Sequence, residues 1–302
     1  MNLPTFLIIG AARSGTTSLY RYLKQHPQVY MSPRKETNFL AFAGESIARR
    51  GPRYRRMVAH AVGSLEAYAE QFAGCTTQTA LGEASPKYLY RYSRSIQNVR
   101  TYIPQARLIA ILRHPVERAY SHYLLTLRGG KEPLNDFAAA VEAEPSRIHE
   151  DWEDEFFYVT RGFYYKQLRA YYDAFPPEQI RVYLHEDLTS GAAGLMRDLF
   201  AFIGVDPTFP VDVSTHHHSA RNAIIPNNPF WVFIWRRLPQ SRRYFRWRLY
   251  SVWRFIRRSL QKQPGHTPPL TPETRARLIA GHREDILKLQ DLIGRDLGGW
   301  LK

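Results

Sequence analysis

The stretch that decides the fold is FLIIGAARSGTTSL, residues 6–19. Its apolar and β-branched beginning predicts a buried strand over residues 5–9. Residues 10–15 predict a tight turn, and residues 16–25 predict a helix that ends before a proline. In such a turn, backbone amides and the positive end of the helix converge on a phosphate group. We expect these amides to come from Ser14, Gly15, Thr16 and Thr17.

The turn differs from the phosphate loop of nucleoside triphosphatases. Its glycine spacing matches the pattern G-x-x-x-x-G-K-[ST], but Thr16 stands where that pattern has lysine. The loop carries a different cation, Arg13. The apolar run at residues 107–112 leads into Arg113 rather than into an acidic residue that could hold Mg²⁺. A metal-dependent ATPase or kinase is therefore disfavoured, and a chance cluster of small residues is the simplest alternative.

Further segments of strand and helix character follow along the chain. Strands that alternate with helices imply a parallel sheet covered on both faces, an α/β fold with a central parallel sheet. Residues 49–74 resemble an irregular helical insertion. The predicted strands are 29–31, 79–83, 107–112 and 180–184, and the predicted helices are 115–127, 164–175 and 191–203.

The bulk composition limits the function classes. The net charge of +15 predicts attraction to anions such as phosphorylated nucleotides, acidic glycans, nucleic acid or anionic lipid. The single cysteine, Cys75, excludes an internal disulfide, and no stretch approaches the 18 apolar residues of a membrane span. These features favour a cytoplasmic protein. A nucleic-acid or lipid binder without catalysis would explain the charge but not two ordered nucleotide motifs, so we expect no nucleic-acid partner.

A second motif, LIAILRHPVERAYSHY, covers residues 108–123. Arg113 follows the end of a predicted strand, where α/β folds collect ligand groups. Ser121 lies about two helical turns further on, so both side chains can reach one phosphate. The guanidinium supplies charge and a forked pair of donors, and the serine adds a hydroxyl donor.

These two motifs resemble those of sulfotransferases that use 3'-phosphoadenosine 5'-phosphosulfate (PAPS), especially the bacterial and heparan-sulfate types. The resemblance implies a P-loop-like three-layer α/β/α fold and a single sulfotransferase domain over residues 1–302, with its core at about 5–210. It also implies metal-independent, in-line transfer of a sulfuryl group to a hydroxyl or amine. Arg13 takes the position of the catalytic basic residue, and Arg113 and Ser121 take those of the 3'-phosphate ligands.

Weaker matches suggest further residues of the site. Residues 32–39 resemble the P-K-E-x-x-F stretch whose glutamate is the catalytic base, which makes Glu36 the candidate base. Residues 82–88 resemble the E-K-[ST]-P segment and make Glu83 the alternative base. Ala84 replaces the usual lysine there, so Lys35 or Lys87 would have to compensate unless Arg13 suffices alone. Tyr164, in a G-x-Y-x-x-x-L match, contacts the nucleotide or acceptor, or packs in the core.

The last third of the chain is less specific. Three consecutive histidines at 216–218 cannot share a metal on a regular element, and Arg221 after them is a candidate nucleotide contact. Residues 229–260 hold nine arginines and ten aromatic residues but no acidic residue. As a helix, residues 240–260 would suit either peripheral contact with the inner face of the membrane or packing on the domain. Residues 272–293 predict a final helix. The acceptor, whether glycan, lipid or another small molecule, is not identified.

Overall fold

The computed structural model describes residues 1–45, 58, 60–129, 131–214 and 269–302. Within these ranges five parallel strands form one sheet, in the order β2-β3-β1-β4-β5. Parallel pairing fits their composition, because strands buried on both faces are almost continuously apolar. Their bounds are Phe6–Gly10 for β1, Val29–Met31 for β2, Ala80–Ala84 for β3, Arg107–Leu112 for β4 and Ile180–Leu184 for β5.

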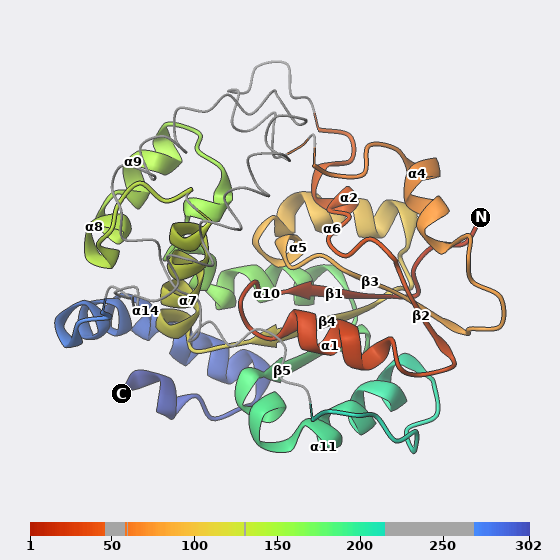
Figure 1. Cartoon of the computed structure of the whole chain (residues 1–302). Coiled ribbons are helices and arrows are strands. Elements are labelled where there is room, and N and C mark those ends of the chain that lie inside the picture. Colours follow the sequence, from red (N-terminus) through yellow and green to blue (C-terminus); the bar gives the residue numbers. More distant parts are fainter. Residues whose placement is uncertain (46–57, 59, 130, 215–268) are drawn as a thin grey trace, which may run out of the picture.

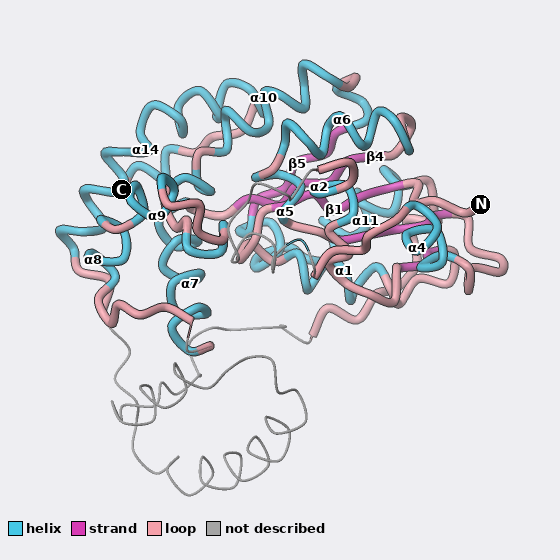
Figure 2. The backbone as a smooth tube through the Cα atoms, turned by 90° about the horizontal axis from the view of Figure 1, so that it is seen from above, coloured by secondary structure: helices cyan, strands magenta, loops and turns pink. Residues whose placement is uncertain are grey.

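Two layers of helices cover the sheet (Figures 1 and 2). One apolar cluster joins one face to α1 (Thr16–Leu23) and α11 (His185–Ile203). A second cluster joins the other face to helices from both halves of the chain. These are α2 (Phe39–Phe42), α4 (Leu65–Ala69), α5 (Lys87–Tyr90), α6 (Tyr92–Tyr102), α10 (Tyr164–Ala174) and α14 (Pro272–Ile293).

A smaller group of helices lies beyond the end at which the strands terminate (Figure 1). Its members are α7 (Pro115–Arg128), α8 (Phe137–Glu142) and α9 (Glu144–His149). A third apolar cluster joins α7 and α8 to α14. A buried ion pair also stabilises this group, because Nη1 and Nη2 of Arg147 each lie 2.8 Å from a carboxylate oxygen of Glu132. The carboxyl ends of the strands therefore face the group formed by α7, α8 and α9 (Figure 1).

Short 3₁₀ turns complete the described chain. The turns η2 and η3 lie between α9 and α10 and bring residues 154–162 against α7. Their bounds are Glu70–Phe72 for η1, Asp154–Phe156 for η2, Thr160–Gly162 for η3, Pro177–Gln179 for η4 and Gly298–Leu301 for η6.

The predicted three-layer fold with a parallel sheet is confirmed, and β2, β4 and β5 have the predicted bounds. The helix expected at 191–203 instead begins at His185, because Asp187 accepts a hydrogen bond from the amide of Leu184 and caps an additional turn. A kink at Gly191 hid this turn from the sequence pattern. The helices α5 and α6 were not predicted. The basic aromatic residues 229–260 lie outside the described residues.

Candidate functional site

The phosphate-binding turn lies between the central strand β1 and helix α1. Gly15 adopts a left-handed conformation with φ of 111°, and a Cβ atom there would lie 2.6 Å from the side chain of Leu188. No side chain caps the first turn of α1, so the amides of Thr16 and Thr17 have no intrahelical acceptor. The hydroxyl of Ser14 is buried and has no hydrogen-bond partner among the described residues. Such orphaned donors suit an anionic ligand.

The second motif meets this turn directly. Because β1 and β4 are parallel neighbours, Arg113 emerges at the same edge of the sheet as the turn. Arg13 donates to the Ser121 hydroxyl from Nε at 3.2 Å and from Nη2 at 3.1 Å. The Nη1 atom of Arg113 donates to the backbone oxygen of Arg13 at 3.4 Å. Three residues predicted from two motifs about a hundred positions apart are thus in contact.

Positive charge gathers at this meeting point, where Arg13, Arg113 and Arg128 lie close enough to affect one another. Burial lowers the pKa of Arg13, and the nearby charges of Arg113 and Arg128 lower it further. Within the described part of the chain, Arg13 forms no ion pair. The site is therefore arranged to accept negative charge from a ligand.

Tyr164 supports the backbone of Arg113 from the start of α10. Its side chain is fully buried, and its hydroxyl donates to the backbone oxygen of Arg113 at 2.9 Å. Burial raises its pKa to about 12, so the phenol stays protonated and remains a donor. Tyr164 fixes the backbone that carries Arg113, which is the packing interpretation of the two that the sequence allowed.

Glu36 and Glu83, the two candidate bases, have opposite surroundings. The side chain of Glu36 is 50% exposed and forms a 2.6 Å ion pair with Lys35. Glu83 is fully buried on β3, where it accepts hydrogen bonds from Thr37 at 3.0 Å, from Tyr68 at 3.3 Å and from Ser85. Burial raises the pKa of Glu83. These contacts tie the loop that carries Glu36 to the sheet, while Glu83 itself has no exposed surface.

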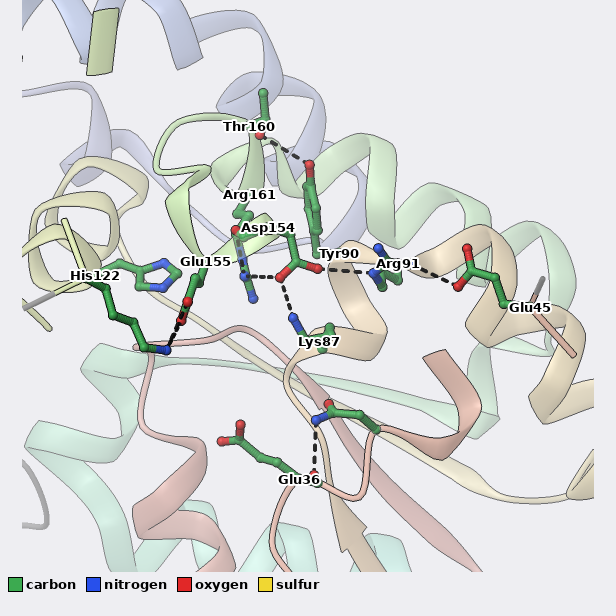
Figure 3. A network of polar contacts seen from close by, with 12 residues as sticks. Glu36, Glu45, Lys87, Tyr90, Arg91, His122, Asp154, Glu155, Thr160 and Arg161 are labelled. Carbon is green, nitrogen blue, oxygen red and sulfur yellow. Dashed lines mark hydrogen bonds and ion pairs between the residues drawn. The ribbon is translucent and has the colours of Figure 1, made fainter. Parts of the chain in front are cut away.

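Lys87 belongs to an ion-pair network around Asp154 (Figure 3). Asp154 is 2% exposed and contacts Lys87, Arg91 at 3.1 Å and Arg161 at 3.4 Å. Burial alone would raise the pKa of Asp154, but the three cations outweigh it and hold that pKa well below its ordinary value. Lys87 is thus held by a carboxylate, and Lys35 by Glu36. Neither cation has the uncompensated environment of Arg13.

His185 also lies at the candidate site, although neither sequence motif indicated it. It follows β5 directly, and its ring lies beside Gly15, 3.8 Å from where a Cβ atom of that residue would be. Burial lowers its pKa, and the charge of Arg113 lowers it further. Its position after a strand end, like that of Arg113, was the available signal.

Other predicted residues are not placed. Arg221, the histidines at 216–218 and the segment 240–260 lie outside the described residues. Among the residues that are described, no group of three or more His, Cys, Asp or Glu side chains could hold a metal ion. No helix in those ranges is long and apolar enough to cross a membrane.

Comparisons with known proteins point to one family. A family model described as the sulfotransferase family matches residues 4–210. A membrane-associated sulfotransferase of Dictyostelium discoideum is 30% identical over 126 residues, 42% of this chain and 24% of that protein. The human bifunctional heparan sulfate N-deacetylase/N-sulfotransferase 3 is 24% identical over 311 residues, 99% of this chain. The chain covers 31% of that human protein, so it spans about a third or less of either relative.

A solved structure agrees over the whole length. The crystal structure of a sulfotransferase from Alicyclobacillus acidocaldarius superimposes with a TM-score of 0.76 and 29% sequence identity. The match covers 100% of both chains. The family predicted from the two nucleotide motifs is confirmed.

Proposed function

The chain belongs to the sulfotransferase family, and we propose that it transfers the sulfuryl group of PAPS to a hydroxyl or amine of an acceptor. The observation that carries the proposal is the contact of Arg13 with Ser121, at 3.1 and 3.2 Å. This contact joins the turn expected to hold the 5'-phosphosulfate to the helix expected to hold the 3'-phosphate. A nucleotide with phosphates at both positions matches that pair of subsites.

Each residue of the site would have a distinct role. The amides of residues 14–17 and the hydroxyls of Thr16 and Thr17 bind the 5'-phosphosulfate, while Arg113 and Ser121 bind the 3'-phosphate. His185 packs beside the nucleotide. Donors of this kind need no metal ion to neutralise the two phosphate groups, so we propose a metal-independent reaction.

The reaction is an in-line displacement at sulfur. A lone pair of the acceptor oxygen or nitrogen forms the new bond to sulfur while the bond from sulfur to the bridging oxygen breaks. Glu36 takes the acceptor proton, and adenosine 3',5'-bisphosphate leaves with the negative charge on its 5'-phosphate. Arg13 stabilises that charge as it develops, which is the largest single contribution in many enzymes. Its guanidinium remains protonated and so does not act as an acid.

Glu36 is favoured over Glu83 as the base because its side chain is exposed to an incoming acceptor. A base must reach the acceptor proton directly or through one water molecule, and Glu83 has no exposed surface.

Replacement of the two carboxyl groups tests this assignment. Glu36→Gln keeps the size of the side chain but removes the base, so turnover should fall about 10²–10⁴-fold while affinity for the bisphosphate is retained. Glu83→Gln should instead lower the midpoint of urea unfolding. A Glu36→Gln enzyme with the wild-type rate, beside an inactive but stably folded Glu83→Gln enzyme, would reverse the assignment.

The reaction itself is tested with radiolabelled PAPS in the presence of EDTA. We expect acceptor-dependent transfer of label to a glycan or small-molecule alcohol, since curated relatives are named as heparan sulfate and carbohydrate sulfotransferases. ATP with Mg²⁺ should give no phosphoryl transfer to the same acceptors. Phosphoryl transfer from ATP, with PAPS inert, would favour the kinase alternative.

A cytoplasmic location with peripheral membrane contact through residues 240–260 is a separate proposal. It is supported by the composition of that segment, which combines arginines with tryptophans and has no acidic residue. Binding to vesicles that contain anionic lipid, lost on deletion of the segment, is the expected result.

A further inference from the structure

His122 directly follows Ser121 on α7, yet the mechanism above gives it no role. Its ring is only 5% exposed. Its Nδ1 atom lies 3.4 Å from Nη1 of Arg118. A guanidinium has donors but no acceptor, so Nδ1 must accept this hydrogen bond. The proton of the neutral ring therefore sits on Nε2.

The position of Arg118, which donates this hydrogen bond to His122, is itself fixed by its neighbours. It is the largest of the fully buried side chains in the described ranges, and its Nη2 atom donates to the backbone oxygen of Tyr158. The ring of Tyr158 also meets the His122 ring edge to face, at 5.7 Å between centroids and 86° between planes. The orientation and the tautomer of His122 are thus both fixed by neighbours on two elements.

The Nε2 atom of His122 has no hydrogen-bond partner among the described residues. The groups facing the ring carry mostly positive charge. Burial lowers the pKa of His122 well below its ordinary value, and Arg161, Arg118 and Arg13 lower it further, against an opposing effect of Asp154. The imidazole is therefore neutral at physiological pH, with one donor available for a ligand.

The position of the ring indicates which ligand would use this donor. Ser121 and Arg13, on one side, belong to the proposed nucleotide site. On the other side Figure 3 shows the ring next to Glu155, with Arg161 beyond that carboxylate and Glu36 lower in the view. Since the nucleotide side is already supplied with donors by the turn, Arg113 and Ser121, the acceptor is the ligand left for this donor.

We propose that His122 is an acceptor-binding residue that donates its Nε2 hydrogen to an oxygen lone pair of the acceptor, such as a sugar hydroxyl or ring oxygen. This inference rests on the proposed sulfotransferase function. A fixed neutral donor cannot remove a proton from the acceptor, which leaves that step to Glu36. It also favours acceptors rich in oxygen lone pairs over protonated amines, which offer none.

The kinetic experiment compares His122→Phe, which keeps the ring but removes the donor, with His122→Gln, whose amide can restore a donor near the Nε2 position. The acceptor probes are 4-nitrophenol and a de-N-sulfated heparan chain. We expect His122→Phe to lower kcat/KM for the acceptor about tenfold, mainly through KM, and His122→Gln to recover most of the loss. Calorimetric affinity for adenosine 3',5'-bisphosphate should stay within about twofold of wild type.

The matched control is His26→Phe. His26 is also a buried histidine, but its Nε2 atom is bonded to the backbone oxygen of Asp206 at 3.0 Å, remote from α7. This change should leave the acceptor KM at its wild-type value. An unchanged acceptor KM in His122→Phe, or an equal loss of bisphosphate affinity, would overturn the inference.

Nitrogen-15 NMR of labelled histidine provides a test that does not depend on turnover or on folding of a variant. The His122 ring should show a protonated Nε2 and a bare Nδ1 at neutral pH. With the bisphosphate already bound, its Nε2 signal should shift when either acceptor probe is added. A protonated Nδ1, or a signal indifferent to both probes, contradicts the inference. A wild-type protein that does not bind the bisphosphate would instead defeat the proposed function.

Discussion

Two groups of basic side chains lie near the carboxyl end of the sheet, and they differ in how their charge is balanced. Lys87, Arg91 and Arg161 surround the buried carboxylate of Asp154. Arg13, by contrast, forms no ion pair within the described residues, and burial together with Arg113 lowers its pKa. The cations of the first group already have a charge partner in the folded protein. Arg13 would gain a charge partner when an anion binds, which is the property expected of a substrate site.

Asp154→Asn should have the largest effect on the balanced group. It would remove the buried carboxylate that Lys87, Arg91 and Arg161 share, and breaking a buried pair costs about 3–5 kcal/mol of unfolding free energy. Urea unfolding measures this loss. Asp173→Asn, which breaks an exposed pair with Arg169 at 2.8 Å, is the control and should cost about 0.3–0.5 kcal/mol. Equal losses in the two variants would remove the distinction between the groups.

Arg13→Ala should show the opposite pattern, a loss of catalysis without a loss of stability. Charge grows on the bridging oxygen only as the bond to sulfur breaks, so the rate should fall about 10²–10³-fold, as when one oxyanion donor is removed. Affinity for the bisphosphate product should fall much less, and Arg13→Lys should recover much of the rate. If product binding weakened as much as turnover, Arg13 would be a uniform binding contact rather than a catalytic one.

Arg113→Ala and Ser121→Ala test the two residues proposed to bind the 3'-phosphate. Loss of a charge-assisted hydrogen bond should weaken bisphosphate binding by about 1.5–3 kcal/mol in Arg113→Ala. The neutral hydroxyl of Ser121 should cost less, about 0.5–1.5 kcal/mol. Calorimetry measures both values. Undiminished affinity in Arg113→Ala would show that the 3'-phosphate binds elsewhere.

Asp285 is a carboxyl group that, unlike Asp154, has a raised pKa in the folded protein. It accepts a hydrogen bond from the amide of Tyr165 at 3.1 Å, at the start of α10, but burial raises its pKa to about 6. A carboxyl group whose pKa is higher in the folded state stabilises the fold when protonated and loses that contribution as pH rises. Relative to Asp285→Asn, the wild type should therefore lose about 1–2 kcal/mol of stability between pH ~4 and ~6. If the free energy of unfolding changed with pH in the same way in both proteins, this prediction would be wrong.

The sequence predicted the parts of the site that depend on local order along the chain. A strand, a glycine turn and a helix must place residues 13–17 at one edge of a parallel sheet, and a parallel neighbouring strand must deliver Arg113 to the same edge. That reasoning placed Arg113 and Ser121 at one phosphate, while the direct contact of Arg13 with Ser121 was not predicted. It also predicted the bounds of β4, because a strand buried on both faces is uniformly apolar.

The residues it did not predict depend on tertiary contacts that leave no local pattern. Asp154 lies 67 positions from Lys87 along the chain, and nothing around either residue indicates that they meet. His122 reads as an ordinary polar residue of an amphipathic helix until Arg118 and Tyr158 are placed around it. The burial of Glu83 likewise requires the position of Tyr68, which comes from a short helix that was only indicated as an irregular insertion.

Calorimetric binding of adenosine 3',5'-bisphosphate in EDTA, compared with adenosine 5'-monophosphate, tests the central claim most directly. The two nucleotides differ by the 3'-phosphate alone, which Arg113 and Ser121 are proposed to bind. We expect the bisphosphate to bind about a hundredfold more tightly, from the combined contacts of Arg113 and Ser121, and we expect added Mg²⁺ not to increase its affinity. Equal affinities, or binding only with Mg²⁺, would contradict it.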